Sequence, residues 1–593
     1  MALLQLIGPL AISFPARTLP LERNSSFIAT KKNPSCRASN NSNCQTISRR
    51  SANYQPSIWN HDYIQSLRSE YMEESYKEQS RILSEEVRVM LGKVENHLDQ
   101  LEMIDVLQRL GVDYHFKNEI MNILDNIYNM DTSKRKKDLH ATALEFRLLR
   151  QHGYDISTDV FIRFQDEAGS FKKDQFVDAE GMLSLYEASF HSWEDETILD
   201  EARDFTLEFL NESLTKNKCN HYLSLLISHA LELPLHWRIS RLEAHWFINV
   251  YGGKENMNPA ILQLAILDFN IGQAIYQEEL KYTSRWWKKI GLVEKLSFAR
   301  DRLVESFIWT VGINFKPDFG KFRTVITKVN SLVTTIDDIY DVYGTLEELE
   351  LFTEAIDKWD LNAIEILPSY MKICFLALYN FINDLAYETL RENGYYISPY
   401  LNKAWADICK SYLTEAKWYY NGYTPSFKEY TENAWISISA PVLLTYAPFL
   451  IPHSIKKEDL VYIEEYSNIV RFSAMISRLA NDLASYKREN ETGYVPKAVQ
   501  CCMNETGASE TEACEYIKSM MYTTWKKMNK EARYSSLPQN FIDTAVNIAR
   551  MALCMYQHGD GNTFQDPEIR NHTLSLIIQP IPDLSVYRGI VKK

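Results

Sequence analysis

The sequence predicts an all-α protein built from two helical domains. Apolar residues recur at spacings of three and four over long stretches, which is the period of an amphipathic helix. Glycine and proline, which interrupt helices, number only 20 and 19 among 593 residues. With 45% hydrophobic and 12% aromatic residues, the chain can also fill a large core. Its length favours more than one domain.

Helical periodicity begins near Tyr54 and continues to the end of the chain. Clear examples of predicted helices are 71–97, 101–110 and 141–151. The breaks between such segments contain glycine or proline, and the strongest is 251–259, with a glycine pair, charged residues and a proline. We therefore expect one helical domain at 49–257 and a second at 258–593. The first contains no D-x-D-D run, so an acid site of the protonating type is not expected there.

The first 48 residues differ from the rest in composition. They are rich in Ser and Thr and carry five bases against the single acid Glu22, namely Arg17, Arg23, Lys31, Lys32 and Arg37. This is the composition of an organellar transit peptide, so we expect residues 1–48 to direct the protein to the plastid stroma. The alternative is an ordinary disordered terminus.

Composition also limits the partners that the protein can have. A net charge of −14 argues against nucleic acid, which would need a basic face. No uninterrupted apolar run has the length of a membrane-spanning helix, so we expect a soluble protein without a membrane partner. The nine cysteines form no paired C-x-x-C spacing, so a zinc site or a disulfide framework is not expected.

Three carboxylates stand inside an apolar segment at Asp337, Asp338 and Asp341. On a helix, Asp337 and Asp341 are four residues apart and lie on one face. Because the neighbours are mostly apolar, this helix should be buried, and a buried carboxylate without a positive partner is costly. Oxygen ligands at this spacing suit a hard cation such as Mg²⁺ or Mn²⁺. An acidic helical turn in solvent is the alternative.

A second polar stripe is predicted at Asn481, Ser485 and Glu489, which are spaced by four residues and so share one helical face. Taken alone, this stripe is best interpreted as a polar helix end. Together with Asp337 and Asp341 on another helix, it indicates the opposite wall of a metal site. Basic residues bracket both motifs: Arg300, Arg302, Arg478 and Lys497. Arg300 and Arg302 can converge on one ligand only from a loop or a helix end, and Lys497 should lie in a mobile loop. Metals and bases together indicate a diphosphate ligand.

These motifs resemble those of plant class I terpene synthases, most closely the angiosperm monoterpene synthases. The resemblance rests on D-D-x-x-D at Asp337, N-D-L-x-S-x-x-x-E at Asn481, R-x-R at Arg300, and Arg49-Arg50 followed after eight residues by Trp59. It spans essentially the whole chain after residue 48. It implies an N-terminal α-barrel-like domain and a C-terminal α-helical bundle that holds the catalytic site.

The resemblance also implies chemistry, namely the ionisation of geranyl diphosphate with three Mg²⁺ ions, or Mn²⁺. The implied metal ligands are Asp337, Asp341, Asn481, Ser485 and Glu489. The implied diphosphate contacts are Arg300, Arg478 and Lys497, with Asp337, Asp341 and Asn481 reaching the diphosphate through the metals. Asp338 belongs to the same catalytic motif. Three aromatic residues match pocket positions in the family, Trp309, Tyr412 and Phe564, although core packing is the favoured interpretation for each one taken alone.

The expected product is a cyclic monoterpene formed through the α-terpinyl cation, of the limonene, α-terpineol, sabinene or thujene type. In the family, the tandem arginine Arg49-Arg50 is associated with isomerising the substrate before ring closure. Asn330 lies two helical turns before Asp337 and should line the cavity, where its amide leaves room for a ten-carbon cation or holds a water. Ser477 is similarly small. A purely space-filling role for Asn330 is the alternative.

Other functions remain open from the sequence. A synthase with acyclic products, such as ocimene, myrcene or linalool, is the second enzyme hypothesis. A sesquiterpene synthase is less favoured, because such enzymes usually lack the transit segment, and a prenyl-chain elongase would carry two aspartate-rich runs. A helical scaffold without catalysis is disfavoured by the intact ligand set. We expect a monomer or a weak homodimer.

Overall fold

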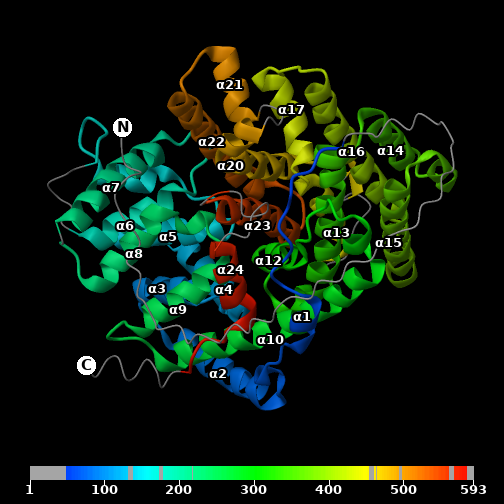
Figure 1. The fold of residues 1–593 in the computed structure, drawn as a ribbon. Helices are drawn as coiled ribbons and strands as arrows, with labels where there is room; N and C mark the ends of the chain where they lie inside the picture. Colours follow the sequence, from blue (N-terminus) through cyan, green and yellow to red (C-terminus); the bar gives the residue numbers. More distant parts are fainter. Residues whose placement is uncertain are drawn as a thin grey trace, which may run out of the picture. The chain divides into compact units, whose positions relative to one another are not determined.

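The computed structural model describes residues 49–583 apart from 131–137, 172–177, 217, 453–459, 462–463, 493–496, 558 and 560–566, and within 487–492 it describes the backbone only. The part of the chain from Arg49 onward forms one compact unit. Over the described residues its regular secondary structure is helical, with one isolated β-bridge between Gln165 and Phe171 and no strand. The all-α prediction is confirmed (Figure 1).

The first half of this unit contains nine α-helices, counted over its described residues. They are α1 (His61–Ser66), α2 (Glu74–Lys93), α3 (His97–Arg109), α4 (Lys117–Asn129), α5 (Leu139–Gln151), α6 (Ala179–Ser189), α7 (Thr197–Thr215), α8 (His221–Glu232) and α9 (Ser240–Gly252). Short 3₁₀ segments connect them: η1 (Glu70–Met72), η2 (Asp113–Phe116), η4 (Thr158–Phe164) and η6 (Leu235–Trp237).

The second half begins with the long helix α10 (Pro259–Ile290). The helices that follow are α11 (Leu292–Lys295), α12 (Leu303–Ile313), α13 (Gly320–Asp338), α14 (Leu346–Lys358), α15 (Ser369–Asn393), α16 (Ser398–Tyr420), α17 (Phe427–Ser437), α18 (Ala440–Tyr446), α20 (Asn468–Thr492), α21 (Ala498–Thr506), α22 (Glu510–Tyr534), α23 (Gln539–Tyr556) and α24 (Pro567–Thr573). Short segments are η7 (Pro317–Phe319), η9 (Leu361–Ile366) and η10 (Ala447–Phe449), and two π-helical turns are η8 (Ile339–Tyr343) and η11 (Leu574–Ile578).

The predicted helices over 101–110 and 141–151 correspond to α3 and α5. The predicted helix over 71–97 is too long at both ends, because the chain turns at Val94–Asn96 and starts α3 anew. Asn96 caps that start, since its side chain accepts a hydrogen bond from the backbone N–H of Leu98.

The break predicted at 251–259 lies between α9 and α10, where Asn258 caps α10 and Pro259 occupies its first turn. The apolar core nevertheless crosses this break. One core cluster extends from Ile64 to Ile581, and α10 packs against α2 and α9 of the first half as well as α12 and α13 of the second. Figure 1 shows α10 running along the base of the molecule between the two halves. Helices α5–α8 have a core of their own. The domain boundary at 257/258 stays a prediction.

Helix α13 shows how the sequence can bury a helix that contains many hydroxyl groups. Ser331 donates to the carbonyl of Thr327 at 2.8 Å, and Thr335 donates to the carbonyl of Ser331 at 3.0 Å. These bonds within the helix satisfy the hydroxyls without solvent. The helix can therefore lie in the core and still carry carboxylates at its end.

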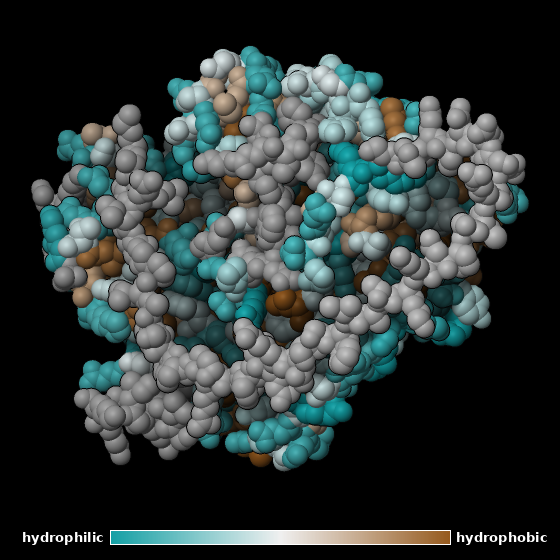
Figure 2. All heavy atoms as spheres, viewed as in Figure 1, coloured by the Kyte–Doolittle hydropathy of each residue, from teal (hydrophilic) through white to brown (hydrophobic). Residues whose placement is uncertain are grey.

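The described surface is mostly hydrophilic on the face in Figure 2, where hydrophobic residues form separate small areas. In the part of the chain that the structure describes, no helix combines the length and the apolar character that crossing a membrane requires.

Candidate active site

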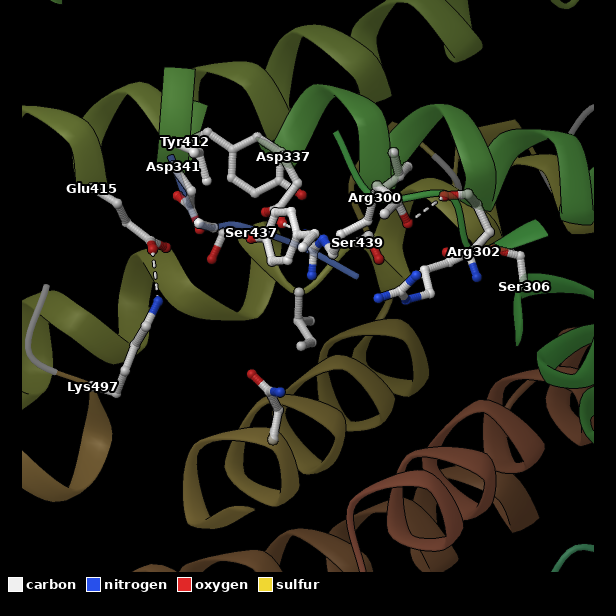
Figure 3. Close-up of a pocket in the computed structure, with 18 of the residues that line it drawn as sticks. Arg300, Arg302, Ser306, Asp337, Asp341, Tyr412, Glu415, Ser437, Ser439 and Lys497 are labelled. Carbon is white, nitrogen blue, oxygen red and sulfur yellow. Dashed lines mark hydrogen bonds and ion pairs between the residues drawn. The ribbon is translucent and has the colours of Figure 1, made fainter. Parts of the chain in front are cut away.

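A cavity of about 690 Å³ lies among the helices of the second half and beneath the segment that precedes α1 (Figure 3). Its lining comprises Arg50, Ser51, Ala52, Asn53, Tyr54, Gln55, Arg300, Arg302, Ser306, Asn330, Val333, Thr334, Asp337, Asp341, Val342, Tyr412, Glu415, Tyr419, Ser437, Ile438, Ser439, Arg478, Asn481, Lys497 and Tyr556. Most of the residues predicted as site residues therefore meet in one place.

The acidic wall comes from the end of α13 and the π-helical turn η8. Asp337 belongs to the last turn of α13 and Asp341 to η8, and both line the cavity. Loss of hydration and the nearby Asp337 carboxylate raise the pKa of Asp341 to about 8. A carboxylate in this position is unfavourable as an anion until a cation joins it. The acidic wall therefore fits a metal ion.

The opposite wall comes from α20. Asn481 lines the cavity, and its Oδ1 accepts a hydrogen bond from Arg478 Nη1 at 3.1 Å. Ser485, one turn further on, is 1% exposed, and its Oγ has no hydrogen-bond partner among the described residues. A buried hydroxyl without a partner is costly, and a metal ion would satisfy it. Glu489 follows in the same helix, and its side chain lies outside the described part.

The described side chains contain no group of three or more His, Cys, Asp and Glu placed to hold a metal ion. The expected ligand set explains this result. It includes an amide and a hydroxyl, Asn481 and Ser485, and one of its carboxylates, Glu489, is outside the described side chains. The oxygen donors that are described still suit Mg²⁺ or Mn²⁺.

Arg300 lies in the loop before α12, as predicted for an arginine that cannot share a helical face with Arg302. Its backbone N–H donates to Asp338 Oδ2 at 2.7 Å, its Nε is 2.9 Å from Asp338 Oδ1, and its Nη2 donates to Asp337. Burial alone would lower the pKa of Arg300, but these carboxylates raise it well above its usual value. Arg302 lines the cavity close by, and its Nη1 donates to the carbonyl of Asp301 at 2.9 Å.

Asp338 does not line the cavity. It is 0% exposed and lies under the acidic wall, where it binds Arg300. Within the aspartate-rich motif, Asp337 and Asp341 thus face the cavity, while Asp338 faces the protein interior.

Besides Asn481, Arg478 contacts groups on α17 and α20. Its Nε donates to the carbonyl of Ala434 at 3.0 Å, its Nη2 donates to Ser437 Oγ at 3.0 Å, and its Nη1 is 3.3 Å from Asp482. Asp482 is fully buried and also accepts hydrogen bonds from Tyr430 and from the backbone of Ala498. The guanidinium is therefore fixed at the cavity wall.

Lys497 was expected in a mobile loop, and the structure places it differently. It caps the start of α21, is 8% exposed and points into the cavity, where its Nζ is 3.3 Å from Glu415 Oε2 (Figure 3). The four residues before it lie outside the described part of the chain.

The predicted pocket residues divide into three groups. Asn330 and Tyr412 line the cavity. Trp309 is buried outside the lining and packs edge-on against Tyr556, which does line it, with ring centroids 6.2 Å apart. Ser477 is buried and donates to the carbonyl of Ser473 in its own helix. Phe564 lies outside the described residues.

Sequence reasoning missed several lining residues. Val333 and Thr334 were within its reach, because they follow Asn330 at spacings of three and four on the same helical face. Ser439 was not, because it joins α17 to α18 with a left-handed backbone, φ 71°, that no local pattern indicates. Glu415 was not, because its importance comes from Lys497, 82 residues away in the chain.

The segment before α1 contributes residues 50–55 to the cavity lining and is anchored at its start. Arg49 donates to both carboxylate oxygens of Glu348 at 2.7 Å and lies against the rings of Tyr343 and Tyr370. Arg50 lies over the ring of Tyr419 at 4.1 Å. We call residues 49–59 the strap.

Comparison with known proteins identifies the family. Residues 58–231 match the family described as "Terpene synthase, N-terminal domain", and residues 288–527 match "Terpene synthase family, metal binding domain". The chain is 57% identical to the chloroplastic myrcene synthase of Quercus ilex, over 90% of each protein. It is 54% identical to the (−)-α-terpineol synthase of Vitis vinifera, over 93% of this chain and 96% of the relative.

Solved structures agree with this result. A limonene synthase with 2-fluorolinalyl diphosphate has a TM-score of 0.88 and 44% identity over 90% of this chain and 100% of its own. The isoprene synthase of Populus x canescens, in complex with three Mg²⁺ ions and dimethylallyl-S-thiolodiphosphate, has a TM-score of 0.83 and 46% identity over 89% and 100%. The chain therefore belongs to the terpene synthase family, the carbon–oxygen lyases that act on diphosphate substrates, and carries the family's metal-binding domain.

Proposed function

We propose that this chain is a plastidial monoterpene synthase that ionises geranyl diphosphate and closes a ring through the α-terpinyl cation. The observation that carries the proposal is the convergence of two carboxylates, Asp337 and Asp341, with the amide of Asn481 and the bases Arg300 and Lys497 in one cavity lining. One turn beyond Asn481 in the same helix, Ser485 has a buried hydroxyl without a partner among the described residues. Hard oxygen donors suit metal ions, and basic side chains held in place beside them suit a diphosphate that the metal ions bind.

Three Mg²⁺ ions, or Mn²⁺, would be held by Asp337, Asp341, Asn481, Ser485 and Glu489. When bound, they would neutralise the diphosphate and so make it a better leaving group. The similar isoprene synthase, which was solved in complex with three Mg²⁺ ions, supports this number.

The bases of the chain have a separate task. Arg300, Arg478 and Lys497 would bind the departing diphosphate and stabilise the negative charge that it gains when the carbon–oxygen bond breaks. Because Arg300 and Arg478 are already fixed by buried carboxylates, little reorganisation accompanies bond cleavage.

The remaining lining suits a carbocation. Tyr412, Tyr419 and Tyr556 present aromatic rings to the cavity, and each such contact stabilises a desolvated cation by on the order of 1–2 kcal/mol. Asn330 faces the same space and is the proposed place for a water that ends the reaction as an alcohol. An acyclic product is the second candidate, favoured by the high identity to a myrcene synthase.

The function is tested by incubating the full-length protein with geranyl diphosphate and Mg²⁺ and identifying the volatile products by mass spectrometry. We expect cyclic monoterpenes as the main products and no turnover with EDTA. Mainly myrcene, ocimene or linalool would favour the acyclic candidate. A higher kcat/KM with farnesyl diphosphate would contradict the assignment as a monoterpene synthase.

Plastid location is proposed from the basic, Ser- and Thr-rich residues 1–48 and from relatives that are named chloroplastic. A fluorescent protein fused behind these residues should enter chloroplasts and lose the segment on import. Retention of the intact fusion in the cytosol would contradict the proposal.

The strap gives a prediction about ring closure. Replacing Arg49 by Met removes the paired hydrogen bonds to Glu348 and should loosen the cover of the cavity. We expect the cyclic share of the products to fall several-fold, since an open cavity releases or hydrates the cation before it isomerises. Product ratios by gas chromatography measure this change. Arg81→Met, which breaks an exposed pair with Glu78, is the matched control and should leave the ratio as it is.

A further inference from the structure

Each of the three bases proposed to bind the diphosphate is paired with a buried carboxylate that is not among the expected metal ligands. Arg300 is paired with Asp338, Arg478 with Asp482 and Lys497 with Glu415. Of these three acids, Glu415 is the one that also lines the cavity. We propose that Glu415 is a positioning residue for diphosphate binding, which holds Lys497 extended into the cavity before the substrate arrives. This inference rests on the proposed function.

The contacts of Glu415 fix the carboxylate itself. Its Oε1 accepts a hydrogen bond from Asn433 Nδ2 at 3.2 Å, and its Oε2 meets Lys497 Nζ at 3.3 Å. Asn433 is held in turn by the carbonyl of Ser411 at 3.2 Å. Glu415 is 6% exposed, so solvent does not compete for the pair. In Figure 3 the side chains of Glu415 and Lys497 point toward each other, and Asp341 lies beside Glu415.

The charge of Glu415 is maintained in this setting. Burial alone would raise its pKa, but Lys497 and Arg478 hold the pKa below its usual value. A buried ion pair contributes little net stability, because the loss of hydration offsets the attraction. Stability alone therefore gives weak reason for placing such a pair in the wall of a binding cavity, whereas positioning of Lys497 gives a direct one.

A lysine needs this support more than the two arginines do. A guanidinium binds several partners at once through its planar fork, and both Arg300 and Arg478 do so. Lys497 is a single charge on a flexible stem. Its ammonium has three donors, so it can keep Glu415 on one side and bind a phosphate oxygen on the other. Fixing it in advance lowers the entropy lost when the diphosphate binds.

The test measures binding of inorganic diphosphate, with Mg²⁺ present, to the full-length protein by calorimetry, together with KM and kcat for geranyl diphosphate. The variants are Glu415→Gln, Lys497→Met, the double variant and Glu415→Asp. The control is Glu350→Gln. Glu350 lies on α14 and forms a half-exposed ion pair with Lys417, which lies on α16, the helix that also carries Glu415. Thermal unfolding of each variant reports whether it is folded.

We expect Glu415→Gln to raise the Kd for diphosphate and the KM about tenfold, with a smaller change in kcat. Lys497→Met should do the same, and the double variant should be no worse than Lys497→Met, because the two residues act as one unit. Glu415→Asp should bind diphosphate more tightly than Glu415→Gln and less tightly than the unmodified protein. If Glu415→Gln does not fold, Glu415→Asp replaces it in the comparison and should still raise the Kd. The control should bind like the unmodified protein.

Two results would overturn the inference: diphosphate binding by Glu415→Gln that is unchanged or tighter, or effects of the two single variants that simply add. The calorimetric readout needs no turnover, so it is independent of the proposed function. A protein that binds diphosphate and shows the coupling, but does not convert geranyl diphosphate, would refute the proposed substrate and leave the pairing intact.

Discussion

Replacing Asp337 or Asp341 by Asn is expected to lower the turnover of geranyl diphosphate by about 10³-fold. Both carboxylates face the cavity from one wall, and an amide has the same size but lacks the charge that holds a metal ion. Product formation at saturating substrate and Mg²⁺ measures the effect. Asp357→Asn, which alters a surface pair with Lys410, is the matched control and should keep full activity.

Of these two variants, Asp341→Asn should not lose stability in the absence of metal, because Asp341, unlike Asp337, is not paired with Arg300. Asp337 and Asp341 repel each other, and this repulsion contributes to the raised pKa of Asp341. Removing one charge relieves it, so the midpoint of urea unfolding should stay or rise while activity disappears. Activity within tenfold of the unmodified protein, or a large drop in the midpoint, would contradict the role proposed for this wall.

Local periodicity was enough to predict the faces of single helices. The spacing of Asp337 and Asp341, and that of Asn481 and Ser485, places each pair on one side of its helix, and the structure has both sides meeting at the cavity or just behind it. Asn330 lines the cavity for the same reason. These are short-range properties, which depend on the repeat of the helix and on little else.

Long-range pairing was beyond such reasoning. Residue spacing did not predict that Asp338 is buried against Arg300 while Asp337 faces the cavity. This arrangement depends on the loop that carries Arg300, 38 residues earlier in the chain. Glu415 resembles any other acid on the polar side of a helix until α21 brings Lys497 to it. The same limit applies to the strap, whose anchor Glu348 is some 300 residues from Arg49.

The second large effect is expected at Asp338, although this residue does not reach the cavity. Asp338→Asn should lower the free energy of unfolding by about 3 kcal/mol, since it leaves Arg300 buried without its main carboxylate. Turnover should fall about 10²-fold as well, because Arg300 would then bind Asp337 more closely and withdraw it from the metal site. Urea unfolding and steady-state kinetics measure the two effects.

A second change separates stability from function at this site. Adding Arg300→Met to Asp338→Asn removes the stranded charge, so stability should recover in part, whereas turnover should fall further because a diphosphate contact is gone. Glu243→Gln is the matched control: it breaks a buried pair with Arg109 far from the cavity and should lower stability while kcat is kept. If Asp338→Asn behaved like this control and lost stability while kcat stayed intact, the role of Asp338 would be to stabilise the fold and not to assist turnover. If Asp338→Asn loses both stability and kcat, and the double variant recovers stability but not kcat, the buried aspartate sets the position of Arg300.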